Sequence, residues 1–292
     1  MLVTEMTEPA VLRHRQIQPG SKSPGSTQGP YLRRLISYVG GDPAGGWIND
    51  NPETGLISER TVSGILWLHA GHRQYGVHNH TVAEIFVILQ GTVEAMEPAG
   101  RRQIAGPLDC LYMEPGVPHS VRAIGTEDVI LLWVHDALEQ ATEGVSEYWD
   151  DEDEAPDRGA ARTRLVRWAD LEPDWSLPRA GEGGYLRRTM SWVGGAEGKL
   201  HFNRDTGIVN DRLVLGATVI EPGNREPAHS HATAEHMLIV SGRAAPPDDG
   251  EPLGPLDFVL APPGVEHGLR ALGDERLAVV WIREEVEPDG RG

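Results

Sequence analysis

The chain has 292 residues, of which 39% are apolar, and it is rich in glycine (35) and proline (22). Its formal net charge of -18 disfavours nucleic acid and anionic membrane surfaces as partners, because an acidic chain repels both. A single cysteine excludes an intrachain disulfide and is typical of a reducing compartment. No signal-like N-terminal run and no apolar stretch of ~20 residues occurs, so we expect a cytoplasmic protein.

The N-terminal residues 1–30 end in PGSKSPGSTQGP, which has little to bury, and we expect a flexible tail. The chain then repeats itself. YLRRLISYVGG at 31–41 returns as YLRRTMSWVGG at 185–195, and LDCLYMEPGVPH at 108–119 returns as LDFVLAPPGVEH at 256–267. Repeats over so long a period indicate duplication of a whole domain. The predicted organisation is a tail (1–30), a first domain (31–137), an acidic linker and connector (138–184), a second domain (185–284) and a C-terminal tail (285–292).

Each copy consists of short segments rich in valine, isoleucine, leucine and tryptophan, such as EIFVILQGTVEAM, separated by glycine, proline or aspartate. No long apolar repeat with a helical period interrupts them. The sequence therefore predicts an all-β protein in which each copy is a small barrel or jelly roll. Cys110, in the apolar stretch LDCLYM, is expected to be a small core residue.

A polar pattern recurs in both copies, as HNHTVAEIFVILQG at 78–91 and HSHATAEHMLIVSG at 229–242. Two histidines separated by one residue point to the same side of a strand. A glutamate follows four residues after the second histidine, and a third histidine follows a Pro-Gly turn more than 30 residues later. The candidate ligands are His78, His80, Glu84 and His119 in the first copy and His229, His231, Glu235 and His267 in the second.

Three imidazoles and one carboxylate suit Fe(II), Mn(II), Ni(II), Cu(II) or Zn(II), whereas Ca(II) prefers oxygen ligands alone. Four ligands on a six-coordinate ion leave two positions for water, a chelating substrate or dioxygen. We therefore expect two divalent transition metals per chain, with Fe(II) favoured. The polar flank AGHRQYGVHNH favours the first copy as the working site if only one is active.

The same motifs resemble those of bicupins, which carry two cupin domains in tandem. Gly71 and Gly91 frame the first pattern, as Gly223 and Gly242 frame the second, in the manner of the first cupin motif. The resemblance covers about residues 31–137 and 185–284 and implies two double-stranded β-helix (jelly-roll) barrels, each holding one metal.

The sequence departs from the usual second cupin motif at two points. Leu108 and Leu256 precede the aspartate, where many cupins have glycine, and Ala123 and Ala271 stand where asparagine is often found. Neither change touches a predicted ligand.

Several polar residues recur outside the ligand set. Arg122 and Arg270 lie an odd number of residues after the last ligand, so we expect them to point away from the metal. His236 is expected to face outward for the same reason, and His69 and His72 are expected to be exposed or to cap a turn. No phosphate-binding loop or serine-histidine-aspartate signature is present, so no nucleotide cofactor is predicted.

Tyr31 and Tyr185 open the two copies, followed by arginines at 33, 34, 187 and 188. Whether this element adds a strand or reaches a substrate stays open from the sequence.

Three functions agree with this resemblance. The favoured one is a non-haem metal dioxygenase acting on a small phenol, enol or keto acid that chelates the metal through oxygen. The second is a non-redox cyclase, isomerase or decarboxylase, although oxalate decarboxylase-like bicupins are usually longer and no acid residue for that reaction is evident. The third is a binding module without catalysis. Beyond the metal ligands no catalytic residue is predicted.

The resemblance also bears on assembly. Tandem cupins imply a monomeric pseudo-dimer, or a homodimer of such chains, with a small molecule as the other partner.

Overall fold

The computed structural model describes residues 2–17, 33–51, 53, 55–74, 76–140, 147–159, 161–195, 207–247 and 250–284. These residues form two compact units, one of residues 17–169 and one that joins residues 1–16 to residues 170–292. We call them the N-terminal and the C-terminal barrel. Among the described residues no helix is long and apolar enough to cross a membrane.

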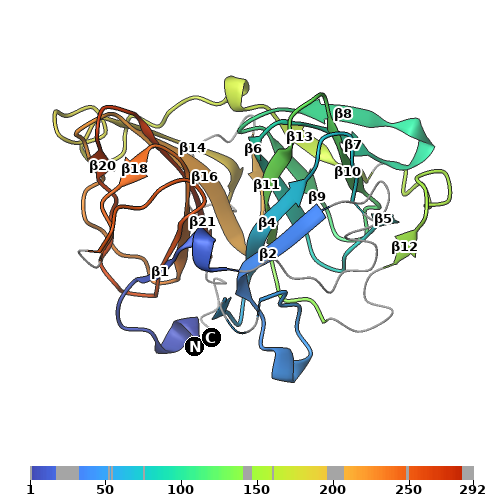
Figure 1. Ribbon diagram of the computed structural model, residues 1–292, viewed down its shortest axis with the longest axis horizontal. Coiled ribbons are helices and arrows are strands. Elements are labelled where there is room, and N and C mark those ends of the chain that lie inside the picture. The colour runs from blue at the N-terminus through green and yellow to red at the C-terminus, as the bar shows by residue number, and fades with distance from the viewer. Residues whose placement is uncertain are drawn as a thin grey trace. The chain divides into compact units, whose positions relative to one another are not determined.

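The N-terminal barrel has a seven-stranded sheet, a three-stranded sheet and a short strand pair (Figure 1). In spatial order the seven strands are β13 (Arg164–Val166), β9 (Cys110–Met113), β6 (Glu84–Gln90), β11 (Val129–His135), β4 (Val62–Leu68), β2 (Arg33–Gly40) and β3 (Leu56–Ile57). The three are β10 (Ser120–Ile124), β7 (Thr92–Met96) and β8 (Arg102–Ala105), and the pair is β12 (Tyr148–Trp149) with β5 (Val77–His78).

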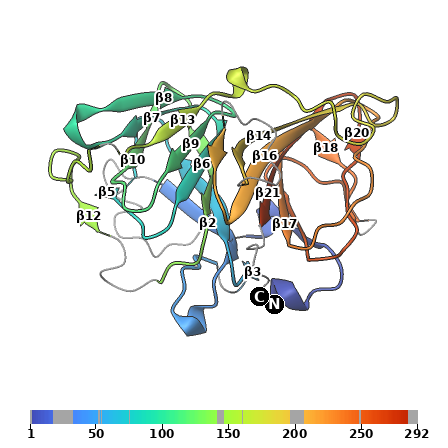
Figure 2. The ribbon, with the colours of Figure 1, turned by 180° about the vertical axis from the view of Figure 1, so that it is seen from behind.

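The C-terminal barrel repeats the seven-stranded order (Figures 1 and 2). Its strands are β1 (Ala10–Leu12), β19 (Phe258–Ala261), β17 (Glu235–Ser241), β21 (Leu277–Glu284), β16 (Leu213–Ile220), β14 (Arg187–Gly194) and β15 (Ile208–Val209), with β18 (Arg243–Ala244) paired to β20 (Ala271–Leu272). The helical segments described are single 3-10 turns: η1 (Val3–Glu5), η2 (His14–Gln16), η4 (Pro43–Gly45), η5 (Pro98–Gly100) and η6 (Trp168–Asp170). The predicted all-β class and the duplication are confirmed.

Alternation along the strands places the core inside each barrel. In β6, Phe86 and Ile88 join the inner apolar cluster, while Glu84, two residues earlier, has the same orientation. Trp133 in β11 packs over Gly64, because a Cβ at Gly64 would lie 2.7 Å from the indole ring. Cys110 is fully buried, as predicted, and burial raises the pKa of its thiol.

One edge strand of each large sheet lies outside the predicted range of its domain. Residues 10–12, expected in a flexible tail, pair with β19 of the C-terminal barrel, and residues 164–166, expected in the linker, pair with β9 of the N-terminal barrel. Each strand thus precedes one copy in sequence and completes the other. Three-residue strands at a sheet edge carry too short a pattern to stand out in a sequence. The remaining tail residues, 18–30 and 285–292, and Tyr31 lie outside the described residues.

The same polar contact holds both edge strands. Arg13 donates to Asp257 at 3.0 Å, and the backbone N–H of His14 donates to the same carboxylate at 3.0 Å. In the N-terminal barrel, Arg167 donates to Asp109 at 3.0 Å, and the N–H at residue 168 does likewise at 3.0 Å. Arg13 and Arg167 are 154 residues apart, which is also the spacing of the YLRR repeat. The edge strand therefore belongs to the duplicated unit.

This contact gives a stability prediction. Arg13→Ala is expected to lower the free energy of unfolding of the C-terminal barrel by about 1–3 kcal/mol, because it leaves a half-buried carboxylate without its cationic partner. The matched control is Arg15→Ala, which removes an exposed pair with Glu251 and should cost less than about 0.5 kcal/mol. Thermal and urea unfolding measure both. Equal effects of the two variants would contradict the anchoring role of Arg13.

Candidate metal centres

Backbone pairing brings together the first predicted ligand set. His78 lies in β5, and His119 directly precedes β10. The two residues form a two-way bridge, in which the N–H of His78 donates to the carbonyl of His119 at 3.0 Å and the reverse bond measures 2.8 Å. His80 follows two residues after His78, and Glu84 begins β6. The structure thus confirms that the four residues meet, each from a different point of one barrel.

One carboxylate oxygen lies at the centre of this group. Glu84 Oε2 is 3.8 Å from His78 Nε2, 3.3 Å from His80 Nε2 and 2.6 Å from His119 Nε2. All four donor atoms lie within 4.8 Å of one another. Ligand atoms that each stand about 2.0–2.2 Å from a zinc-like ion are themselves about 3–4 Å apart, so this spacing fits one transition metal.

Hydrogen bonds on the outer ring nitrogens turn the inner nitrogens toward the carboxylate. His119 Nδ1 is 2.8 Å from the carbonyl of Val117, and His80 Nδ1 is 2.5 Å from Glu139 Oε2. An Nδ1–H held in this way leaves Nε2 as the basic atom, which is the form that binds a metal. Glu139 also accepts bonds from the backbone and the hydroxyl of Thr81, so its position is fixed in turn.

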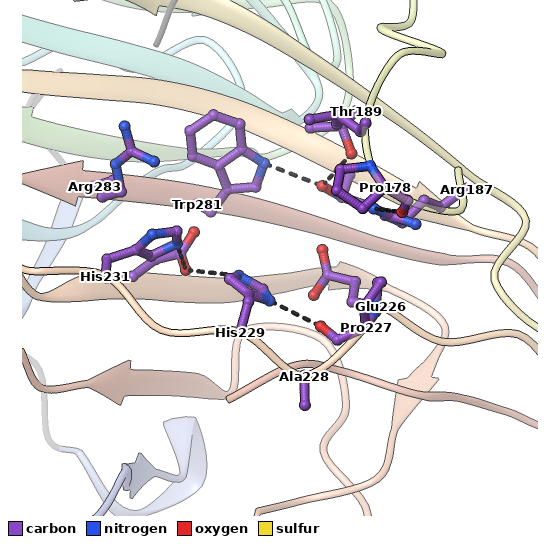
Figure 3. A pocket seen from close by; sticks show the side chains of 13 residues that line it. Pro178, Arg187, Thr189, Glu226, Pro227, Ala228, His229, His231, Trp281 and Arg283 are labelled. Atoms are coloured by element: carbon purple, nitrogen blue, oxygen red, sulfur yellow. Dashed lines mark hydrogen bonds and ion pairs between the residues drawn. The ribbon is translucent and has the colours of Figure 1, made fainter. Parts of the chain in front are cut away.

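The second ligand set has the same construction in the C-terminal barrel. Glu235 Oε2 is 3.7, 3.3 and 2.6 Å from the Nε2 atoms of His229, His231 and His267. His229 and His267 form the two-way backbone bridge, at 2.9 and 2.8 Å. His229 Nδ1 lies 2.9 Å from the carbonyl of Pro227 (Figure 3), and His267 Nδ1 lies 2.9 Å from that of Val265.

Both glutamates are held as carboxylates. Burial opposes their charge, but the surrounding imidazoles outweigh it and keep the pKa of Glu84 and of Glu235 well below the ordinary value. Burial likewise opposes a charge on the histidines, yet the neighbouring carboxylates raise the pKa of His80 to about 10 and that of His229 to about 9. Each site therefore attracts positive charge, and a metal competes there with protons.

The two centres differ in exposure. In the first, the side chains of His78 and His80 are 7% and 8% exposed, whereas those of His229 and His231 in the second are 35% and 22% exposed. Tyr148 of β12 stacks on His78 with the ring centroids 5.3 Å apart. Tyr148 therefore covers one ligand of the buried first centre, while two ligands of the second are partly exposed.

A cavity of about 290 Å³ opens onto the second centre (Figure 3). Besides three of the ligands, its lining comprises Leu177, Pro178, Arg187, Thr189, Thr218, Glu226, Pro227, Ala228, Trp281 and Arg283. The expectation that the first copy is the one filled or active, if only one is, stays a prediction that the paired variants described below test. In the polar flank of the first motif, Gln74 is buried and accepts a bond from the N–H of Val121 at 3.2 Å.

Substitutions between the copies explain the difference. The cross-strand pair Thr189–Thr218 of the second barrel corresponds to the apolar pair Leu35–Leu66 of the first. Glu226 corresponds to Gln74, since both accept a bond from the backbone of the equivalent strand. His135 in the first barrel and Arg283 in the second pair with the metal-site glutamate of their own barrel. The second barrel is thus lined by polar groups where the first is packed.

Two residues near the first centre escaped the sequence analysis. His135 Nε2 lies 3.4 Å from Glu84 Oε1, and His135, Glu139 and His80 form a further group with ligand atoms within 4.8 Å. The signal for His135 was its place at the end of LLWVH, a segment that returns in the second copy as VVWIR. For Glu139 the signal was Glu287, which stands at the same offset of 148 residues but beyond the range 185–284 taken as the second copy.

The other polar residues lie mostly as expected. Arg122 and Arg270 are exposed, and Arg122 contacts Glu94 on the neighbouring strand. His69 lies 3.3 Å from Asp128, and His72 contacts the carbonyl of Ala70, so both serve the turn.

His236 points away from the metal group but is fully buried, which corrects its expected exposure. Burial lowers its pKa to about 4, so it is neutral at ordinary pH.

Comparison with known proteins agrees with this architecture. A family model described as the cupin domain matches residues 65–135 and 216–283. The chain is a bicupin. No curated protein matches this bicupin, so its relatives come from solved structures.

Two of those structures show how far the likeness reaches. A putative glyoxylate-induced protein from Pseudomonas aeruginosa is 14% identical, with a TM-score of 0.62 over 96% of this chain and 88% of its own. A mutant oxalate decarboxylase from Bacillus subtilis is 16% identical, with a TM-score of 0.57 over 96% and 77% of the two chains. Another structure of that decarboxylase is described as having Mn(II) centres. At such identities the likeness establishes the shared fold.

Metal stoichiometry tests both centres. Metal-replete protein is expected to carry about two transition-metal ions per chain, and His80→Ala or His231→Ala should each remove one of them, because a missing imidazole weakens only its own site. Elemental mass spectrometry on desalted protein gives the count. The buried first centre should also release its ion to a chelator more slowly. A count fixed at one in metal-replete wild type would contradict two sites.

Metal retention should also depend on pH. Folded-state pKa values of about 10 for His80 and about 9 for His229 are raised, so protons bind these imidazoles more tightly than free histidine. A metal needs the neutral ring, so binding must displace protons, and affinity should fall as the pH falls below these values. Titration with Zn(II) between pH 6 and 9 is expected to show tighter binding and less proton release at higher pH. An affinity independent of pH would contradict this.

Proposed function

We propose that this bicupin is a metal-dependent enzyme and that its reaction takes place at the second centre, on a small organic substrate that chelates through oxygen. The observation that carries the proposal is the cavity of about 290 Å³ on the second ligand set, beside a first set of the same composition that is buried. A substrate that enters this cavity would reach His229, His231 and Glu235, whereas the ligands of the first set are buried.

The donor set fits a divalent transition metal, which in such a site polarises a chelated oxygen and, if it is redox-active, engages dioxygen. His229, His231, Glu235 and His267 would hold it. Fe(II) is the ion favoured for oxygen chemistry, and Mn(II), Ni(II), Cu(II) and Zn(II) accept the same donors. The first centre, closed and fixed by Glu139, would hold its ion in a structural role.

The chain's own residues bind the substrate and move its protons. Thr189 and Thr218 bond each other at 3.0 Å, and Trp281 donates to Thr218 at 3.1 Å, so the cavity wall is a fixed polar surface. Glu226 lies at the same cavity. Burial raises the pKa of its carboxyl, and the charge of Glu235 raises it further. A carboxyl whose pKa is raised takes up a proton more readily than an ordinary one, which suits a group that exchanges protons with a substrate.

Glu226 bears on the class of reaction. A dioxygenase of the kind that the cupin resemblance favours needs the metal and a chelating substrate, and the second centre offers room for both. The non-redox alternative, an isomerase, cyclase or decarboxylase, also needs an acid or base beside the bound substrate. The sequence analysis named no such residue, and Glu226 supplies one. We therefore propose the non-redox class as the second candidate, supported by this residue.

Paired variants test where the reaction takes place. Small hydroxy acids, keto acids and phenols are screened with metal-loaded protein, with an oxygen electrode and proton NMR as parallel readouts. With any substrate found, His231→Ala is expected to abolish turnover, whereas His80→Ala should retain most of it in protein that stays folded. The opposite ranking would place the reaction at the first centre. No turnover with any metal would leave the non-catalytic binding module as the better account.

Glu226→Gln tests the class of reaction. The change keeps the side-chain volume and removes a titratable group, so a proton-transfer reaction should slow by about 100-fold or more while the second metal stays bound. A dioxygenase that does not use this group should lose far less and should consume oxygen in step with substrate. Product formation without oxygen consumption would exclude the dioxygenase.

A further inference from the structure

Arg187 is a buried cation at the wall of the second cavity. It is the first residue of β14, its relative exposure is 6%, and it contributes to the cavity lining (Figure 3). Its guanidinium donates to the carbonyl of Pro178 at 3.0 Å and to that of Tyr185 at 3.3 Å. A guanidinium has five N–H donors, so these two bonds leave donors available at the cavity.

No carboxylate in the described part of the chain lies within 4 Å of the Arg187 guanidinium. Burial lowers its pKa, and the charge of Glu226, which lines the same cavity, partly offsets this effect. A buried charge without a close partner is costly, and buried charges are normally paired. The partner of Arg187 is therefore to be sought among molecules that enter the cavity.

The next residue shows how an ordinary surface arginine behaves on this strand. Arg188 points to the other side, is 39% exposed at its side chain and lies 3.8 Å from Glu221. Strand alternation thus sends one arginine of the YLRR repeat to solvent and the other into the cavity. Only the inward one lacks a carboxylate in the described structure.

We propose that Arg187 binds the carboxylate of the substrate, and that the second centre is specific for small monocarboxylic acids that carry a hydroxyl or amine donor. This inference rests on the proposed function, because it assigns the substrate class of the same centre. A guanidinium matches a carboxylate with two parallel N–H donors, which suits a buried arginine facing a small anion.

The rest of the cavity limits which acids fit. Its volume of about 290 Å³ is at the lower end for ligand pockets, so the ligand is small. Leu177, Pro178 and Ala228 offer apolar contact. Glu226 adds a second charged group of the opposite sign, which disfavours a second carboxylate nearby and accepts a bond from a hydroxyl or amine.

Lactate and lactamide form a matched pair of probes, because they share a hydroxyl and a size but differ in charge. With Mn(II)-loaded protein and isothermal titration, lactate is expected to bind at least about tenfold more tightly than lactamide. Arg187→Met should remove about tenfold of the lactate affinity and leave that of lactamide unchanged. Arg188→Met is the control and should behave as wild type, because that side chain faces away from the cavity.

Arg187→Lys covers the case in which Arg187→Met disturbs the loop held by the carbonyl bonds. Lysine keeps the charge but not the planar fork, so the preference for lactate should persist at several-fold lower affinity. Metal content and melting temperature are measured for every variant. Wild-type protein that does not prefer lactate, or arginine variants that keep the full preference with the second metal in place, would overturn the inference.

The outcome separates from that of the proposed function, because turnover is a different readout. A lactate preference that depends on Arg187, in a protein without turnover for any substrate, supports this inference and counts against an enzyme. Turnover that needs His231 but not Arg187 supports the proposed enzyme and counts against the role of Arg187 in binding the substrate.

Discussion

A buried carboxylate surrounded by three imidazoles is the constraint on which each barrel depends. Glu84 and Glu235 lie in the interior of a sheet, where an uncompensated negative charge would be very costly. Three histidines must therefore converge on each glutamate. The backbone bridges between residues 78 and 119 and between residues 229 and 267 hold together the two histidines that lie farthest apart in the sequence of each copy. The motif spacing, the turn before the third histidine and the strand order all serve this one meeting point.

This constraint also explains what the sequence could predict. The eight ligands stood out because their spacing is fixed by strand alternation and was preserved in both copies. Arg187 and the threonine pair come from other strands, and only folding brings them beside the ligands. Glu226 lies three residues before His229, but nothing in that spacing predicted that it faces the cavity. The edge strands were missed for another reason, since three residues carry almost no pattern and their partners lie more than 50 residues away.

The two copies share one backbone arrangement but differ in the side chains that line their interiors. Replacing Leu35 and Leu66 with Thr189 and Thr218 exchanges an apolar filling for hydroxyls without moving the strands that carry the ligands. Leu108 and Leu256 show the same conservatism, because both keep the left-handed backbone (φ 65° and 69°) that suits the glycine found there in many cupins. The lining has diverged while the backbone has not.

The edge strands have a consequence for the history and integrity of the chain. Because each strand precedes one copy and completes the other, neither copy is whole when cut at the repeat boundary. A single-copy ancestor with this topology would have needed a second molecule to supply its missing strand, as in a domain-swapped dimer. Fusion of two such copies would make that exchange intramolecular and therefore independent of protein concentration. A protease that cut the connector before Arg164 would leave two fragments, each still holding a strand of the other's barrel.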